Sequence, residues 1–289
     1  MKAEGRKQSP RNPWRLNIYS LAQSVLAKGE AGEPLPSPFK GLTRHEVEFR
    51  RGEFSLVAAG PGTGKSIFAL NLALFGNIPV LYFSADSNAA TQLTRSTAII
   101  MDDDIRDVKR KLLRDEFDEY MSPLSKRWWI RFDYDARPGL WDVELKLRAY
   151  FETFGIFPHL IVVDNITNVS GDSPAGDASE YALGLESMCE YMADMARQTG
   201  AHVLALHHVT GEHSDGLTPI PLSGVKGKIG RVPNLILTLH KEVDGMDCTI
   251  INVSDVKNRE GFADPSGQTF SSYEFNSKNM RLTDVADTL

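Results

Sequence analysis

The chain has 289 residues and a formal net charge of −6, and its hydrophobic and charged fractions, 42% and 24%, are typical of a globular protein. No apolar run could span a bilayer, no signal-peptide core begins the chain and only two cysteines occur, so we expect a cytoplasmic protein without a membrane partner. The negative charge means that any nucleic-acid binding must rest on a local basic patch.

Three regions follow one another along the chain. Residues 1–15 carry basic side chains among polar residues and prolines, which predicts a disordered basic tail. Residues 16–40 are expected to form a linker, because Leu16–Lys28 has helical periodicity and Gly29–Pro38 is rich in glycine and proline. Residues 41–289 repeat a strand–turn–helix pattern and are expected to form one domain.

The pattern in this domain predicts an α/β fold, with a mostly parallel central sheet flanked by helices. Its short apolar runs are typical of strands covered on both faces. The predicted strands are Phe54–Ala59, Val80–Ser84, Trp128–Phe132, Leu160–Asp164, Val203–His207, Leu235–Leu239, Thr249–Val256 and Thr269–Glu274. The predicted helices are Lys65–Phe75, Asn88–Ile99, Asp104–Tyr120, Leu140–Phe154 and Ala178–Gln198. The last strands follow one another directly, so we expect antiparallel additions at one edge.

A phosphate-binding loop connects the first predicted strand to the first long helix. Its residues are Ala59, Gly60, Pro61, Gly62, Thr63, Gly64, Lys65 and Ser66, which match the P-loop pattern in its required context. The glycines let backbone N–H groups turn toward phosphate oxygens, and the helix N-terminus adds partial positive charge. Lys65 would reach the β- and γ-phosphates of ATP, and the Ser66 hydroxyl would bind Mg²⁺. A glycine-rich turn without a ligand is the weaker interpretation.

Two carboxylates at strand ends could complete this site. Asp164 ends an apolar strand, as the Mg²⁺-binding residue of a P-loop ATPase does, although such a residue can also cap a helix or turn. Asp86 follows the strand Val80–Ser84, where it could polarise the attacking water. Taken alone, Asp86 could equally be the N-cap of the helix that begins near Asn88.

Four stretches of this sequence resemble the RecA-like ATPase core of DnaB-type replicative ring helicases, a group that includes the plasmid RepA-like helicases. The resemblance extends from about Leu35 to the C-terminus. It rests on Ala59–Ser66, on Tyr82–Ser87, on Ile161–Asp164 and on Val256–Gly261, whose Lys-Asn-Arg-Glu-Gly sequence is similar to a turn that generic P-loop proteins lack. We expect that the chain is too short to contain the N-terminal helical domain of DnaB-type proteins as well.

The resemblance implies a role for several residues. Asp86 lies where the family usually has a catalytic glutamate, so the base here is one methylene shorter. His207 or His208 lies where the family has a sensor of the γ-phosphate, and we favour His207. Lys257 and Arg259 lie where the family inserts cations into the nucleotide site of the neighbouring subunit. A site shared in this way would make ATP hydrolysis depend on assembly.

The resemblance also implies partners for the chain. A glycine-rich loop carries Lys226, Lys228 and Arg231 where the family's loops contact DNA. Repeated around a ring, such loops would form a positive channel for single-stranded or forked DNA. We therefore expect a homo-oligomer, most simply a hexameric ring, in which Leu16–Lys28 packs on a neighbour. The implied function is that of an ATP-dependent DNA helicase or translocase in replication.

Three other functions remain open from the sequence. A recombination ATPase would share the core but form filaments on DNA. A structure-specific DNA nuclease would rest on the acidic run Asp102–Asp104 and on the carboxylates of Glu116–Glu119, although runs of this kind are more often a solvated helix face. A regulatory ATPase would have no nucleic-acid role, and DNA would not stimulate its hydrolysis of ATP.

Overall fold

A single twisted sheet forms the centre of the protein. The computed structural model describes residues 32–170, 184–225, 228–244 and 248–285, and within them nine strands pair in the order β3-β2-β4-β5-β1-β6-β7-β8-β9. These strands are β1 Phe54–Ala59, β2 Val80–Ser84, β3 Ile130–Asp133, β4 Leu160–Asp164, β5 His202–His208, β6 Leu235–Asp244, β7 Cys248–Asn258, β8 Ser271–Asn276 and β9 Arg281–Asp284.

The sheet is parallel over most of its width. The strands from β3 to β6 in this order pair in parallel, and β7, β8 and β9 add antiparallel pairs at one edge. The predicted mixed sheet is therefore confirmed. Strand β1 lies at the centre, where Ala59 pairs with His208 of β5 and with Leu239 of β6. All six residues of β1 are buried, so the sheet places the phosphate loop at the end of a fully buried central strand.

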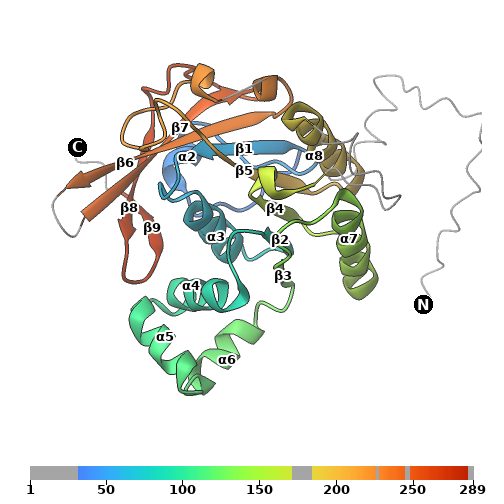
Figure 1. Cartoon of the computed structure of the whole chain (residues 1–289), viewed down its shortest axis with the longest axis vertical. Helices are drawn as coiled ribbons and strands as arrows, with labels where there is room; N and C mark the ends of the chain where they lie inside the picture. Colours follow the sequence, from blue (N-terminus) through green and yellow to red (C-terminus); the bar gives the residue numbers. More distant parts are fainter. Residues whose placement is uncertain (1–31, 171–183, 226–227, 245–247, 286–289) are drawn as a thin grey trace, which may run out of the picture.

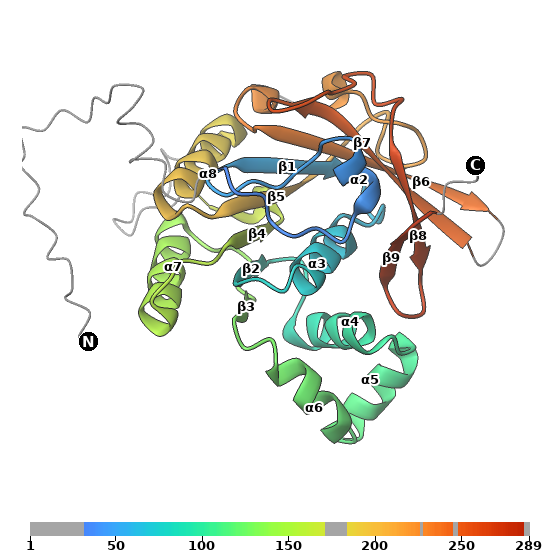
Figure 2. The ribbon, with the colours of Figure 1, turned by 180° about the vertical axis from the view of Figure 1, so that it is seen from behind.

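Helices cover both faces of the sheet (Figures 1 and 2). On one face, α3 packs its apolar side chains against β1 and β5, and on the other face α8 contacts the same two strands. The helices are α2 Lys40–Arg44, α3 Lys65–Phe75, α4 Ala89–Met101, α5 Ile105–Leu113, α6 Asp118–Ser125, α7 Leu140–Phe154 and α8 Leu185–Thr199, with short 3-10 turns η1 Ile166–Asn168, η2 Leu222–Gly224 and η3 Lys228–Arg231. Among the residues that the structure describes, no helix has the length and hydrophobicity needed to cross a membrane.

The sequence predicted that the folded domain begins at residue 41. In the structure, the chain already contacts this domain before that residue. Pro34 forms an antiparallel bridge with Arg50, and Leu35 is buried in the core. The ring of Phe39 stacks on Phe68 of α3, with 4.3 Å between the ring centroids. These contacts bury apolar surface that a free linker would leave in water. The predicted tail 1–15 and helix Leu16–Lys28 lie outside the described residues.

The region between β2 and β3 differs from its prediction. One helix was expected over Asp104–Tyr120, but α5 ends at Leu113 and α6 begins at Asp118. Asp115 adopts a left-handed conformation with φ of 57°, which a continuous α-helix cannot contain. The predicted helix had the correct start, since the Asp104 side chain accepts a hydrogen bond from the backbone of Arg106 and caps α5.

The C-terminal hairpin of β8 and β9 closes the edge of the sheet against α3 and α4. Strand β8 begins two residues later than predicted, and β9 was not predicted. The Asn71 side chain of α3 donates to the carbonyl of Met280 at 3.0 Å and accepts from the backbone N–H of Leu282 at 3.2 Å. Arg281 donates to the carbonyl of Ile99 at 2.8 Å. Polar contacts with α3 and α4 therefore fix this hairpin.

Candidate active site

The phosphate loop lies between the end of β1 and the start of α3. Gly62 and Gly64 have φ angles of 71° and 115°, which residues with a side chain adopt only with strain. A Cβ at Gly64 would also lie 2.6 Å from the side chain of Ile251 on β7. Since α3 begins at Lys65, its first backbone N–H groups and its dipole face the loop. This geometry fits the binding of an anion such as the triphosphate of ATP.

Lys65 is folded onto the phosphate loop and is 5% exposed. Its ammonium donates to the carbonyls of Ala59 and Gly60, both at 2.9 Å. It also lies 3.1 Å from the Nδ1 atom of His208. Burial lowers the pKa of Lys65 to about 8, although the carboxylates of Asp164 and Asp86 oppose this shift. A triphosphate would supply the negative charge that a buried ammonium needs.

Asp164 ends β4 beside the first turn of α3. Its carboxylate is 4% exposed and accepts a hydrogen bond from the Tyr82 hydroxyl at 3.0 Å. The Ser66 hydroxyl forms a second hydrogen bond with it. Burial raises the pKa of Asp164, so a cation at this point would stabilise its charged form. A carboxylate and a hydroxyl at one point are oxygen ligands suited to Mg²⁺, and the two predicted metal ligands therefore fit that ion.

Asp86 lies at the neighbouring strand end and does not cap a helix. The N-cap of α4 is Asn88, whose side chain accepts from the backbone N–H of Thr91 at 2.9 Å. One carboxylate oxygen of Asp86 accepts from the Asn168 side chain at 2.7 Å. The other oxygen lies 3.8 Å from the Nε2 atom of His208. The carboxylate of Asp86 is therefore oriented from both sides, and Asn168 is a site residue that sequence reasoning missed.

His208, rather than the favoured His207, is the histidine that lies beside the phosphate loop. Successive residues of a strand point to opposite faces, and His207 faces the α8 side with Ala205. His207 is 5% exposed, its ring nitrogens contact no hydrogen-bond partner among the described residues, and burial lowers its pKa to about 4. Because an ammonium can only donate, Nδ1 of His208 accepts from Lys65 and the ring proton is on Nε2, toward Asp86.

The connection from β5 to β6 passes beside the phosphate loop, because β1 lies between these two strands. A Cβ at Gly60 would lie 2.4 Å from the carbonyl oxygen of Ser214, and a Cβ at Gly216 would lie 2.1 Å from the Thr63 hydroxyl. Gly216 also accepts a hydrogen bond from the backbone of Lys241 at 2.8 Å. Glycines thus permit a close backbone contact that the sequence motif alone did not reveal.

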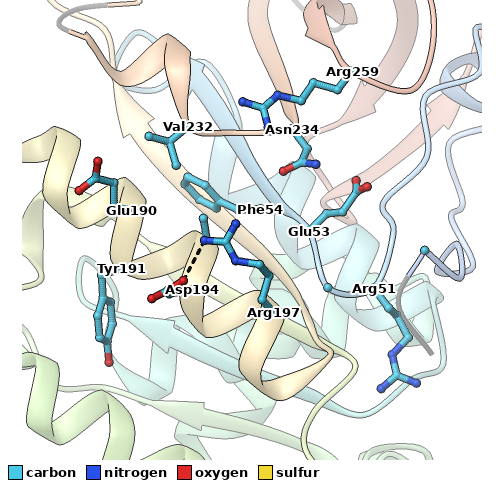
Figure 3. A pocket seen from close by; sticks show the side chains of 13 residues that line it. Arg51, Glu53, Phe54, Glu190, Tyr191, Asp194, Arg197, Val232, Asn234 and Arg259 are labelled. Atoms are coloured by element: carbon cyan, nitrogen blue, oxygen red, sulfur yellow. Dashed lines mark hydrogen bonds and ion pairs between the residues drawn. The ribbon is translucent and has the colours of Figure 1, made fainter. Parts of the chain in front are cut away.

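Arg259 lies at the opposite end of β1 from the phosphate loop. Its backbone N–H donates to Asn234 at 3.0 Å, and that of Asn234 donates to Phe54, the first residue of β1, at 2.8 Å. Figure 3 shows Arg259, Asn234 and Glu53 around one pocket of about 700 Å³. Burial raises the pKa of Glu53, whereas the charge of Arg259 acts in the opposite direction. The structure therefore does not bring Arg259 to the nucleotide site of its own chain.

Lys257 lies on the same end of the sheet and contacts the segment predicted to bind DNA. Its ammonium donates to the carbonyls of Gly230 and Arg231, at 2.6 and 3.1 Å. The guanidinium of Arg259 donates to the carbonyl of Arg231 at 2.7 Å. We call Lys228–Arg231, the residues of η3, the basic turn. The side chain of Arg231 is exposed, while Lys226 lies outside the described residues.

The acidic run near α5 has structural partners. Asp102 forms an ion pair with Arg281 at 2.8 Å, and Asp103 accepts from the Tyr120 hydroxyl at 2.9 Å. Asp104 is the N-cap of α5. Across the ranges that the structure describes, no group of three or more histidine, cysteine or acidic side chains could hold a metal. These contacts give the run a structural explanation and offer no support for a nuclease.

Comparisons with known proteins agree with this geometry. A family described as AAA domain matches residues 47–213. The gene 65 protein of Mycobacterium phage L5 is 48% identical over 267 residues, covering 92% of this chain and 99% of that protein. A solved ATPase domain is similar with a TM-score of 0.70 and 18% identity, covering 92% of this chain and 96% of the other. A solved DnaB-like replicative helicase is similar with a TM-score of 0.69 and 18% identity, covering 92% and 66%. The predicted RecA-like fold is confirmed.

Proposed function

Because the chain belongs to the AAA domain family of P-loop proteins, we propose that it is an ATP-driven DNA helicase or translocase whose subunits form a ring on single-stranded or forked DNA. The likeness of its fold to an ATPase domain and to a DnaB-like replicative helicase supports this proposal.

The nucleotide end would bind and hydrolyse ATP. Residues 59–66 would hold the phosphates, with Lys65 leaving its loop carbonyls for the β- and γ-phosphates. Ser66 and Asp164 would hold Mg²⁺, which neutralises charge on the phosphates when bound. Asp86 would accept a proton from the attacking water, and His208 would donate a hydrogen bond toward the γ-phosphate.

The proposal of a ring rests on a single observation, the position of Arg259. Strand β1 has six residues, so about 20 Å of sheet separates its two ends. An arginine side chain cannot span that distance, and Arg259 cannot stabilise the γ-phosphate bound to its own chain. A cation used in trans requires a head-to-tail interface, which generates closed rings or helical filaments.

An apolar groove offers a place for the neighbouring chain in such an assembly. It lies between α4 and α5, has a volume of about 760 Å³ and includes the exposed side chains of Leu93 and Leu113. The segment Leu16–Lys28 has apolar side chains at helical spacing, and the chain that follows it joins its own domain at Gly32–Leu35. We propose that this arm of one subunit packs in the groove of the next.

Mixed assemblies test the shared site. Lys65→Ala subunits would supply Arg259 but no working phosphate loop. Arg259→Ala subunits would supply a working phosphate loop but no arginine at position 259. Each variant alone should lose about a hundredfold or more of its ATP hydrolysis, and mixing the two should restore activity at sites formed between them. Arg148→Ala is the matched control, since Arg148 is an exposed arginine of α7 paired with Glu152. If mixing restores nothing, the site is not shared.

The role of DNA and the form of the assembly need separate measurements. Single-stranded DNA should stimulate hydrolysis by the wild-type protein, and a rate that DNA leaves unchanged would favour a regulatory ATPase. Electron microscopy with ATP and single-stranded DNA should show closed rings. Continuous helices on DNA would instead indicate a recombination ATPase, because both assemblies can use the same head-to-tail contact.

A further inference from the structure

The side chain of Tyr82 links the middle of β2 to the end of β4. In the register of these two strands, Ser84 rather than Tyr82 is paired with Asp164. Since residues two apart on a strand point to the same face, the long phenol side chain of Tyr82 can reach forward to that carboxylate. Its hydroxyl donates to one carboxylate oxygen of Asp164 at 3.0 Å. This contact brings a donor from the core to a proposed ligand of Mg²⁺.

The ring of Tyr82 is held from both sides, so its hydroxyl has a fixed direction. The ring stacks on Phe132 of β3, with 5.2 Å between the ring centroids and 30° between the planes. On the other side, Val162 of β4 pairs with Tyr82, and both are fully buried in the core cluster that includes the apolar side chains of α3. Closely packed side chains keep one rotamer, and a phenol is protonated at neutral pH. Tyr82 is therefore a rigid hydrogen-bond donor.

Asp164 is a carboxylate that such a donor can orient. It is 4% exposed, so water can supply little of its hydrogen bonding. The Ser66 hydroxyl also bonds to it, but Ser66 is itself a proposed ligand of Mg²⁺. The Tyr82 hydroxyl comes from the core and holds the carboxylate from outside that metal site. A hydrogen bond to an ionised carboxylate is also stronger than one between two neutral groups.

We propose that Tyr82 is a positioning residue for Mg²⁺, because its hydroxyl holds the Asp164 carboxylate in the orientation that the ion requires. This inference rests on the Mg-ATP site of the proposed function and depends neither on the ring nor on DNA. Hydrogen-bond partners of metal ligands orient those ligands, and their loss typically weakens metal binding or activity about 10- to 100-fold. The alternative is that the carboxylate only satisfies a buried hydroxyl, in which case the bond contributes to stability alone.

Metal binding by the full chain with ADP tests this proposal without relying on hydrolysis. Tyr82→Phe keeps the ring and its stacking on Phe132 but removes the hydroxyl. Mn²⁺ accepts the same oxygen ligands as Mg²⁺ and is detected by electron paramagnetic resonance. The Kd of Mn²⁺ for the complex with ADP should be at least about tenfold higher in Tyr82→Phe than in the wild type. In EDTA, the two proteins should bind ADP with equal affinity in titration calorimetry, because the phosphate loop is unchanged.

Tyr150→Phe is the matched control. It also removes a buried hydroxyl, which donates to the carbonyl of Trp129 at 2.6 Å in the core cluster on the other face of the sheet. This variant should leave the Kd of Mn²⁺ unchanged, even if the melting temperature falls. If Tyr82→Phe behaves in the same way, its hydrogen bond is structural and the proposal is wrong. Loss of ADP binding by Tyr82→Phe in EDTA would also overturn it, since the hydroxyl would then support the whole site.

A double variant shows whether Tyr82 acts through Asp164. Asp164→Asn should itself raise the Kd of Mn²⁺, and adding Tyr82→Phe should raise it no further, because the carboxylate that the hydroxyl orients is already gone. A further tenfold rise in the double variant would mean that Tyr82 acts by another route. The proposed function fails separately: wild-type protein that binds Mn²⁺ no more tightly than free ADP does would remove the metal site itself. A rate of hydrolysis that DNA leaves unchanged would remove the helicase and leave the role of Tyr82 intact.

Discussion

The two ends of strand β1 are built in different ways. At its carboxyl end, eight consecutive residues form most of the phosphate site, and strand ends on the same side add Asp164, Asp86 and His208. At its amino end, the pocket around Arg259 combines the segments before β1 and β6 with α8 and the end of β7. The site at the carboxyl end of β1 is thus mostly a local sequence motif. The pocket at its amino end forms only when distant segments of the chain have folded together.

This difference separates what one subunit can do alone from what requires a neighbour. The carboxyl end has the glycines, the lysine and the carboxylates that we propose bind ATP and Mg²⁺. The amino end has the cations Lys257 and Arg259, which donate to backbone carbonyls of the same chain. Variants at the first end should therefore change nucleotide binding, and those at the second should change hydrolysis by the assembly. The following predictions test that separation.

The largest effect is expected at Lys65. Lys65→Ala should lower ATP hydrolysis by about a thousandfold, with or without DNA, because the loop loses the charge that reaches the phosphates. The melting temperature of the Lys65→Ala protein should not fall below that of the wild type. The Lys65 side chain is 5% exposed, and burial already disfavours its charged form. Steady-state hydrolysis and calorimetric melting measure the two quantities.

Nucleotide binding by the variants Lys65→Ala and Arg259→Ala tests the same comparison between the two ends of β1. Lys65→Ala should lose ATP binding in titration calorimetry, whereas Arg259→Ala should retain it, because Arg259 lies about 20 Å of sheet away from the phosphate loop. Equal loss of binding in both variants would show that ATP binding, and not hydrolysis alone, depends on the amino end of β1.

A smaller effect is expected at Asn168, which orients the shortened base. Asn168→Ala should lower kcat about tenfold and change KM little, because the amide holds one oxygen of Asp86 at 2.7 Å without contacting the phosphate loop. Asn168→Asp should lower kcat further, since it places a second carboxylate against Asp86. Asn279→Ala is the matched control, because Asn279 donates to Asp102 in the same way but far from the site. A rise in KM with constant kcat would contradict an orienting role.

The sequence was sufficient to predict the parts of the molecule that depend on neighbouring residues. The parallel strands Phe54–Ala59 and Leu160–Asp164, which lead to the phosphate loop and to Asp164, were predicted with the bounds that the structure shows, because each is a short apolar run. Which of His207 and His208 lies beside the phosphate loop could not be predicted, since it depends on the register with which β5 joins β1. A shift of one residue exchanges the two faces of a strand.

Contacts between distant segments were also outside the reach of sequence reasoning. Asn168 meets Asp86 across 82 residues of chain, and Lys257 meets Gly230 across 27. Neither pair has a spacing that a helix or hairpin would impose. The break between α5 and α6 was missed for another reason, because the left-handed residue Asp115 lies within a sequence that continues a helical pattern.

The smallest effect is expected from pH, and it distinguishes the two lysines. Burial lowers the pKa of both Lys65 and Lys257 to about 8. ATP would bind the protonated form of Lys65, so its affinity should fall about fivefold from pH 8 to pH 9, with net proton uptake on binding. Calorimetry in two buffers of different ionisation enthalpy measures that uptake. The same pH dependence should remain in Lys257→Arg, because that lysine lies at the other end of β1. If Lys257→Arg removed the pH dependence, Lys257 would belong to the nucleotide site and the separation of the two ends would fail.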